Sequence, residues 1–299
     1  MTTKDTPASP AMTLRHVEVL VNLASGGVSP DAAERAKTLL AELGLTGRVQ
    51  APDPAGLGDA LQRAVDAGPD VLMVLAGDGT ARAAAELCGP RGPVLAPLPG
   101  GTMNLLPHAV YGDRPWAEAA AEALAQGSPR MIGGGQVDGR VFLVAAIIGA
   151  PALWAPAREA MRAGRPRLAI MRAQRALSRA FTGRLRYALD CGPRGKAEAL
   201  ALMCPLVSRA MENDADALEV AALDPTGAAE AFRIGLHAML GDWRKDPAVR
   251  VERCTAVRTW AAGRIPALLD GESVRLERAA LIEYRSEVVR VLAPPEPQA

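Results

Sequence analysis

Short apolar runs alternate with amphipathic segments along the first 125 residues of the chain. The runs predict strands at 17–21, 47–51, 71–75 and 94–98, and the run at 71–75 contains no polar residue, which is typical of a strand buried on both faces. Apolar side chains recurring every three or four residues predict helices at 30–43, 57–67, 81–87 and 116–125. Thr80 is expected to cap the third of these helices. Strands that alternate with helices predict an open, mostly parallel α/β sheet.

The pattern changes near residue 130. Short runs rich in β-branched and apolar residues, separated by turn signals such as Asp138-Gly139, predict strands at 130–132, 141–148, 184–189, 199–206, 218–223 and 249–256. The segment 156–181 is expected to be a helical insertion. The second part of the chain is therefore predicted to be a largely antiparallel β domain.

Composition narrows the classes of function. Aromatic residues make up 3% of the chain, too few for the stacking platforms of nucleic-acid binders, so no nucleic-acid partner is expected. The four cysteines are far apart and none has zinc-ligand spacing, which favours reduced thiols and a cytoplasmic location. The polar segment 1–12 has no apolar signal core. The longest apolar run, 141–157, is interrupted by one glycine and two prolines, so no transmembrane segment is expected.

Three polar, glycine-rich loops follow predicted strands, at 22–27, 76–80 and 99–104. Ligands of open α/β sheets bind beyond the carboxyl ends of the strands, and glycine lets backbone N–H groups approach a phosphate closely. Asp78 would repel a bare phosphate, so its presence indicates a cation or a protonated acceptor between the carboxylate and the phosphate. The three loops together predict one phosphate-bearing ligand. The alternative is that each is an ordinary connection between a strand and a helix.

With these loops, the chain resembles the diacylglycerol kinase catalytic family, which includes bacterial lipid kinases and the sphingosine and ceramide kinases. The resemblance rests on four motifs in the expected order, from residue 17 nearly to the C-terminus: Asn22-Leu23-Ala24-Ser25-Gly26, Ala76-Gly77-Asp78-Gly79-Thr80, Pro99-Gly100-Gly101-Thr102-Met103-Asn104 and Asp270-Gly271-Glu272.

The resemblance implies a two-domain α/β protein. An α/β ATP-binding domain is expected over 13–129, with the tail 286–299 as a segment that can return to it, and a β-sandwich lipid-acceptor domain over 130–285. The cofactors implied are ATP and Mg²⁺. The ATP contacts implied are Asn22, Ser25, Gly26, Gly77, Asp78, Gly79, Thr80, Gly101, Thr102 and Asn104. A magnesium loop in the second domain would use a carboxylate of Asp216 and backbone oxygens of Asn213 and Leu218.

The chain departs from the family pattern at several places. The residues that stand where the family usually has others are Leu23, Pro54, Ala76, Arg82, Leu105 and Ala217. Arg82 replaces an asparagine, and we hypothesise that its guanidinium binds phosphate oxygens in place of the missing amide.

The late acidic pair supplies the candidates for a proton acceptor. Asp270 and Glu272 are two residues apart, so on a strand they would point to the same face and reach one site. The resemblance implies Glu272 as the acceptor with Asp270 beside it, while Asp270 and Asp78 are further candidates for the base. The alternative is that Asp270-Gly271 forms a surface hairpin turn.

The insertion suggests where the substrate is found. Residues 158–186 hold nine arginines and one acid, interleaved with bulky apolar residues, which suits an anionic membrane surface; the alternative is a solvated helical face. The leading hypothesis is an ATP-dependent kinase of a hydroxyl on diacylglycerol or on a sphingoid or ceramide lipid, cytoplasmic and peripherally bound to the inner face of the membrane. The alternatives are a kinase of a soluble acceptor such as NAD, and a non-catalytic lipid- or nucleotide-binding module. The oligomeric state is open, with a homodimer as one alternative.

Overall fold

The computed structural model describes residues 14–149, 151–152, 171, 184–208, 211, 215–224, 244 and 246–295. The chain divides into two compact units, a first unit of Met1–Ile132 with Glu287–Ala299 and a second unit of Gly133–Ser286. Two strands, β5 (Ser128–Val137) and β16 (Ala279–Ala293), contribute residues to both units. Within the described residues, no helix is long and apolar enough to cross a bilayer.

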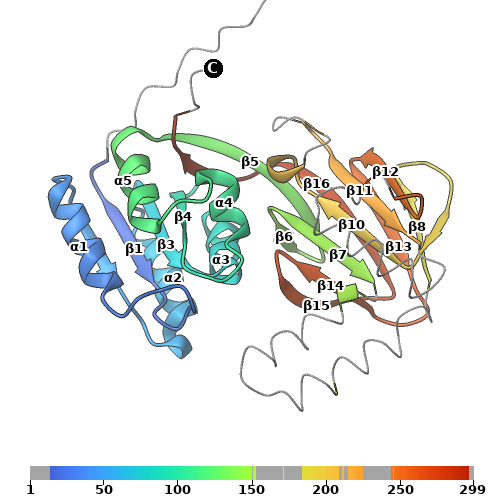
Figure 1. Ribbon diagram of the computed structural model, residues 1–299, viewed down its shortest axis with the longest axis horizontal. Coiled ribbons are helices and arrows are strands. Elements are labelled where there is room, and N and C mark those ends of the chain that lie inside the picture. Colours follow the sequence, from blue (N-terminus) through green and yellow to red (C-terminus); the bar gives the residue numbers. More distant parts are fainter. Residues whose placement is uncertain are drawn as a thin grey trace, which may run out of the picture. The chain divides into compact units, whose positions relative to one another are not determined.

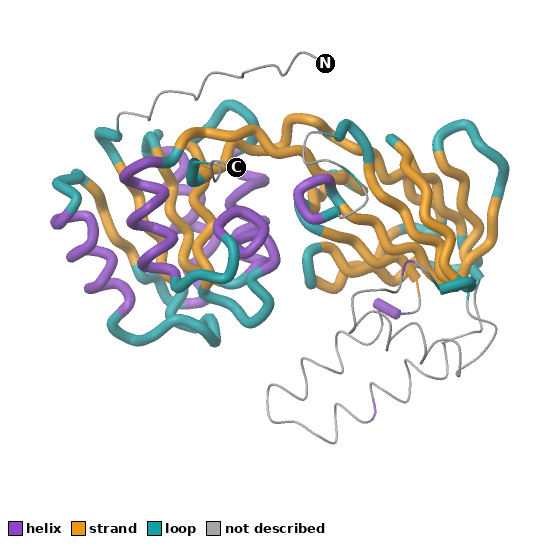
Figure 2. The backbone as a smooth tube through the Cα atoms, turned by 45° about the horizontal axis from the view of Figure 1, so that its top comes forward, coloured by secondary structure: helices purple, strands orange, loops and turns teal. Residues whose placement is uncertain are grey.

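A parallel sheet with helices on both faces forms the first unit (Figures 1 and 2). Its strands follow the order β2 (Gly47–Gln50), β1 (Val17–Val21), β3 (Val71–Ala76), β4 (Val94–Pro99) and the end of β16. All six residues of β3 are buried, as expected of a strand in the middle of a parallel sheet. The helices are α1 (Ala32–Glu42), α2 (Leu57–Asp66), α3 (Asp78–Cys88), α4 (Leu105–Tyr111) and α5 (Trp116–Gln126). A 3₁₀ turn at Pro54–Gly56 precedes α2.

Two local features of the first unit differ from the sequence prediction. The helix after β3 begins at Asp78, and Gly77 occupies the cap position in an extended conformation, so the prediction that Thr80 caps this helix is wrong. Thr80 already belongs to the first turn, because its N–H donates to the carbonyl of Gly77. Helix α4 was not predicted, since it has only seven residues and contains Pro107.

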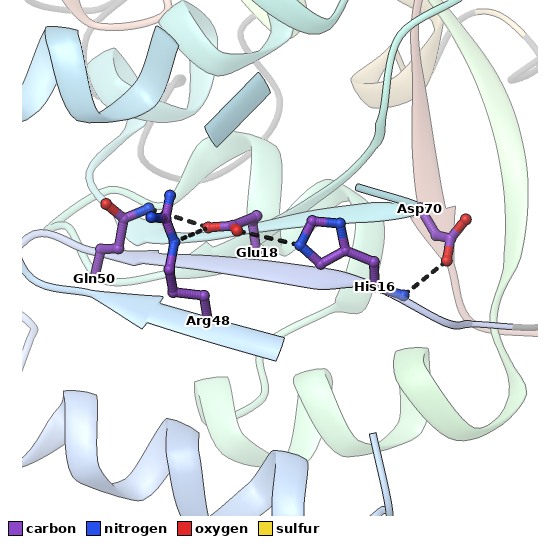
Figure 3. Close-up of polar contacts among 5 residues, drawn as sticks. All are labelled: His16, Glu18, Arg48, Gln50 and Asp70. Carbon is purple, nitrogen blue, oxygen red and sulfur yellow. Dashed lines mark hydrogen bonds and ion pairs between the residues drawn. The ribbon is translucent and has the colours of Figure 1, made fainter. Parts of the chain in front are cut away.

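One charged side chain is buried within the parallel sheet (Figure 3). Glu18 on β1 is only 3% exposed, and its carboxylate accepts hydrogen bonds from Arg48 Nε at 3.1 Å and Gln50 Nε2 at 3.0 Å, both on β2. The ring Nε2 of His16 lies 3.2 Å from the same carboxylate. Just before β3, Asp70 accepts the N–H of His16 at 2.9 Å. Because a slip by one residue would turn Arg48 to the opposite face, this cluster fixes the register of β2 against β1.

The second unit is built from two antiparallel sheets that share one apolar core. One sheet joins β16 to β13 (Ala256–Trp260), β8 (Leu185–Leu189) and β9 (Gly195–Ala197), and β5 pairs with β16 and with β6 (Arg140–Phe142). The other has the order β12 (Val249–Cys254), β11 (Leu218–Leu223), β10 (Ala199–Met203), β7 (Ala145–Gly149), β14 (Ile265–Leu269) and β15 (Glu272–Leu276). The predicted two-domain α/β fold is confirmed.

Strand boundaries in the second unit were predicted less well. The predicted strand 141–148 is two strands, β6 and β7. The backbone N–H groups of Leu143 and Val144, which lie between them, donate to the carboxylate of Asp270 and not to a neighbouring strand. The predicted strand 199–206 ends at Met203 and continues as a 3₁₀ turn at Pro205–Val207. The predicted insertion 156–181 lies outside the described residues, apart from Met171.

The four cysteines are free, and three of them are buried. Burial raises the pKa of the Cys88 and Cys254 thiols to about 12, and it raises the pKa of Cys204 as well. These thiols are therefore protonated at neutral pH and serve as apolar core residues.

Candidate functional site

The three glycine-rich loops meet at the carboxyl edge of β1, β3 and β4. The N–H of Gly27 donates to the carbonyl of Gly100 at 3.0 Å, and the N–H of Gly100 donates to the carbonyl of Ala76 at 3.1 Å. The N–H of Gly77 donates to Ser25 Oγ at 3.2 Å. Each loop therefore contacts the other two, as the sequence predicted for strands that run parallel.

Glycine is required where these loops touch. A Cβ atom on Gly101 would lie 2.7 Å from the Cα of Gly77, and one on Gly100 would lie 2.8 Å from the amide nitrogen of Ala76. Both contacts are with backbone atoms, so neither could be relieved by a side-chain rotation. At Gly26 a Cβ would be 3.9 Å from Thr102 Oγ1, which is an ordinary contact. The close approach brings the backbones of the three loops together in one compact corner.

Two asparagines shape the loops from within. Asn22 Oδ1 accepts the N–H of Ala24 at 3.1 Å, which closes a turn after β1. Asn104 Oδ1 accepts the N–H of Gly101 at 2.7 Å, and Asn104 adopts the left-handed conformation with φ of 49°. Asparagine tolerates that conformation better than most residues. Both side chains therefore support the loop shape, and their predicted contact with ATP stays a prediction.

Asp78 belongs to the second of these loops and is the first residue of α3. Its Oδ1 accepts the N–H of Leu106, at the start of α4, at 3.4 Å. Burial raises the pKa of the carboxyl group, while backbone N–H groups of Leu106, Leu105 and Asn104 act in the opposite direction. A cation next to this carboxylate would relieve the cost of burying its charge. The residue is thus suited to the divalent cation that the family resemblance implies.

Asp78→Asn is expected to raise the stability of the protein at neutral pH. Because burial raises the folded-state pKa above its ordinary value of 3.8, ionised Asp78 opposes folding, and neutral asparagine does not. The gain in stability of Asp78→Asn is present above the folded-state pKa of Asp78. It disappears as the pH falls towards 3.8, where the aspartate is itself protonated. Thermal unfolding of the wild type and of Asp78→Asn between about pH 3 and 8 measures this difference in stability. An Asp78→Asn variant that is less stable than the wild type at every pH would contradict the conclusion that ionised Asp78 opposes folding.

The two carboxylates of the late acidic pair, Asp270 and Glu272, lie in different environments. Asp270 occupies the two-residue turn between β14 and β15, with φ of 44°, followed by Gly271 with φ of 85°. It is only 4% exposed, and its carboxylate accepts three backbone N–H groups: Oδ2 that of Leu143 at 2.7 Å, and Oδ1 those of Val144 and Ala145 at 3.0 and 2.9 Å.

Glu272, by contrast, is exposed and is the first residue of β15. The expectation that the two carboxylates share one face of a strand is therefore wrong, because Asp270 lies in the turn. The alternative of a hairpin turn is confirmed, although the aspartate in it is buried rather than at the surface. The oxygens of Asp270 are thus occupied by backbone N–H groups, whereas the carboxylate of Glu272 is exposed.

Comparison with known families finds one match. The model of the diacylglycerol kinase catalytic domain matches residues 16–137, which include all three loops of the corner. Residues 16–137 therefore belong to the diacylglycerol kinase catalytic domain family. The search of curated proteins found no match.

Solved structures show the same fold over nearly the whole chain. A diacylglycerol kinase from Bacillus anthracis matches with a TM-score of 0.67 and 15% identity, covering 95% of this chain and 98% of that chain. Two further structures from the same organism reach TM-scores of 0.69 and 0.70 at 18% and 17% identity. An NAD kinase from Archaeoglobus fulgidus, solved in complex with ATP, matches with a TM-score of 0.50 and 12% identity, covering 95% of both chains.

Arg82, which departs from the diacylglycerol kinase pattern, is buried in α3. Its side chain is 7% exposed, and Nη1 lies 2.6 Å from Glu86 Oε1, one helical turn away. This ion pair gives the guanidinium a structural role within the helix. Its hypothesised contact with phosphate stays a prediction.

The expected magnesium loop of the second unit is only partly described. Asn213 lies outside the described residues, Asp216 is exposed, and Leu218 begins β11 as a buried residue. The pKa of Tyr284 is raised chiefly by burial and further by the charge of Asp216. The described residues contain no cluster of three or more His, Cys, Asp or Glu that could hold a metal.

Sequence reasoning missed one buried polar cluster near this loop. Glu219 on β11 is fully buried, with Ser208 Oγ donating to Oε2 and Arg244 Nε donating to Oε1 at 2.5 Å. The three residues come from separate segments, so spacing along the chain gave no signal. A glutamate within the apolar strand 218–223 was the sole hint.

Proposed function

We propose that the protein is an ATP-dependent lipid kinase that phosphorylates a hydroxyl of a neutral lipid, either diacylglycerol or a sphingoid or ceramide-type lipid. The observation that carries the proposal is the corner in which the three glycine-rich loops contact one another, with Asp78 in one of them at the start of α3. Phosphoryl transfer requires alignment and neutralisation of charge more than covalent help from the protein, and this corner offers both. The membership of residues 16–137 in the diacylglycerol kinase family supports the same reaction.

The residues have separate roles in the proposal. The amides of the loops, with Ser25 and Thr102, bind the phosphates of ATP, and Gly79 and Thr80 lie in the first turn of α3, where the helix dipole favours a phosphate. Asp78 would hold Mg²⁺, which neutralises phosphate charge when bound. Asp216, with Asn213 and Leu218, would hold the second-unit metal.

Glu272 takes the proton of the attacking lipid hydroxyl in this proposal. It is exposed, so it can reach a substrate, whereas Asp270 uses its oxygens to bind the backbone of residues 143–145. Asp270 is then a positioning residue that fixes the turn from which Glu272 projects. A general base of this kind contributes about 10²–10⁴ to the rate.

The test is phosphate transfer from γ-labelled ATP with Mg²⁺ to a panel of acceptors. Diacylglycerol, a sphingoid base and ceramide are presented in detergent micelles, and NAD is presented in buffer. Label on one of the lipids, lost in Asp78→Asn, supports the proposal and identifies the acceptor. Label on NAD alone would overturn the lipid assignment in favour of a soluble acceptor. No transfer to any acceptor, with ATP still bound, would indicate a non-catalytic nucleotide-binding module.

Arg82→Ala is expected to raise the KM for ATP about tenfold, equivalent to about 1.4 kcal/mol of binding, if the guanidinium also contacts phosphate. The matched control is Glu86→Gln, which weakens the ion pair with Arg82 and keeps the guanidinium. Steady-state kinetics with varied ATP distinguish the two variants. Equal KM values for the wild type and Arg82→Ala would restrict Arg82 to its structural role.

A further inference from the structure

The sheet β16–β13–β8–β9 of the second unit has an outer face that is basic. Direct pairing across the strands brings Trp260 opposite Arg186, and Arg186 opposite Lys196. In the neighbouring row, Arg258 lies opposite Leu281. Residues that pair directly point to the same side of a sheet, so these five form one surface, which we call the basic face.

Alternation along each strand shows that this is the side away from the core. Tyr187, Thr259 and Ile282 alternate with the residues of the basic face, and all three are buried. Arg186, Lys196 and Arg258 are exposed, and Leu281 is 41% exposed. The apolar residues of the other sheet cover the inner side.

In the part of the chain that the structure describes, no acidic side chain forms an ion pair with Arg186, Lys196 or Arg258. Arg194 adds a fourth cation, with its guanidinium carbon 5.5 Å from the centre of the Trp260 ring. Glu283, an acid on the same side, lies in the next row and is paired with Arg285 at 3.0 Å. The face therefore carries a local positive potential although the chain has a net charge of only +1.

We propose that the basic face binds the surface of a bilayer that contains anionic phospholipids. The cations attract the lipid phosphates, while Trp260 and Leu281 place an amphipathic ring and an exposed aliphatic side chain where headgroups meet acyl chains. A nucleic acid suits the face less well, because sequence-independent binding of single strands uses several aromatic rings and this face has one. The preference for a lipid surface also draws on the proposed lipid-kinase function.

Charge removal should have a large effect on such binding. Each Lys or Arg near an anionic membrane contributes about 1 kcal/mol, which is about fivefold in affinity. Arg186→Gln, Lys196→Gln and Arg258→Gln combined are therefore expected to weaken binding on the order of 100-fold. The attraction should also fall as salt is raised from about 0.1 M to 1 M, since the Debye length shrinks from about 10 Å to 3 Å.

A matched control removes the same charge elsewhere on the second unit: Arg140→Gln, Arg264→Gln and Arg275→Gln combined. These three arginines are exposed and lie on β6, before β14 and on β15. Binding is measured by sedimentation with phosphatidylcholine vesicles, with and without phosphatidylglycerol, in the absence of ATP. Thermal unfolding verifies that both triple variants fold, because exposed substitutions change stability by about 0.5 kcal/mol or less.

The expected result is salt-sensitive binding to anionic vesicles that the basic-face variant loses and the control variant keeps. Equal binding by the wild type and the basic-face variant would overturn the assignment of this face, and binding indifferent to phosphatidylglycerol and salt would overturn its electrostatic basis. Binding of a DNA duplex, but not of vesicles, through the same residues would replace the lipid surface by nucleic acid. Phosphorylation of lipids in uncharged detergent micelles tests the proposed kinase function separately, because it does not need this face.

Discussion

Asp270→Asn is expected to destabilise the second unit by about 2–4 kcal/mol, because an asparagine side chain can accept with only one oxygen where the carboxylate accepts three buried N–H groups. An N–H of residues 143–145 is then left without a partner in a buried position. Asparagine tolerates the φ of 44° at this turn, so backbone strain does not contribute. The measured quantity is the thermal unfolding midpoint, which should fall by about 4–16 °C.

Glu272→Gln is the matched variant two residues away. Glu272 is exposed, so its replacement should change stability by no more than about 0.5 kcal/mol, while kcat falls about 10²–10⁴-fold if it is the base. The two variants therefore distinguish a positioning role, expected for Asp270, from a catalytic role, expected for Glu272. If Asp270→Asn left the thermal unfolding midpoint unchanged and greatly reduced kcat, Asp270 would be assigned as the base and Glu272 would not.

Gly101→Ala is expected to reduce kcat/KM for ATP about 100-fold. The new Cβ would lie 2.7 Å from the Cα of Gly77, so the loops 76–80 and 99–104 must move apart by several tenths of an ångström or more. Displacements of about 1 Å cost this much in phosphoryl transfer, which depends on alignment. Some loss of stability, about 1–3 kcal/mol, should accompany the separation of the loops.

Gly58→Ala is the control for a glycine that no contact requires. Gly58 is exposed in α2, and nothing lies within 4 Å of the position of its Cβ. Alanine should stabilise the protein by up to about 1 kcal/mol and leave the kinetics unchanged. Equal activity of Gly101→Ala and Gly58→Ala would show that the contact between the two loops does not govern nucleotide binding.

Local patterns along the chain were sufficient to predict strands β1 to β4 and helices α1, α2, α3 and α5 of the first unit. Continuous apolar runs become buried parallel strands whatever lies next to them, and the three glycine-rich loops follow strands that share an edge. The second unit was harder because its strands are short and several end in turns. The strand at 256–260 was missed, because the predicted strand 249–256 ends where it begins, and only the turn at Thr255, whose N–H donates to Asp190, separates it from β12.

The sequence by itself determined the fold class, the positions of the loops and the presence of an acidic pair. Only the tertiary structure decided what those acids do. Asp270 and Glu272 are equivalent in a sequence pattern, but the N–H groups that Asp270 binds come from residues more than 120 positions earlier in the chain. Burial and hydrogen bonding are set by such distant partners, so the environment that separates the two carboxylates is not encoded in their own neighbourhood.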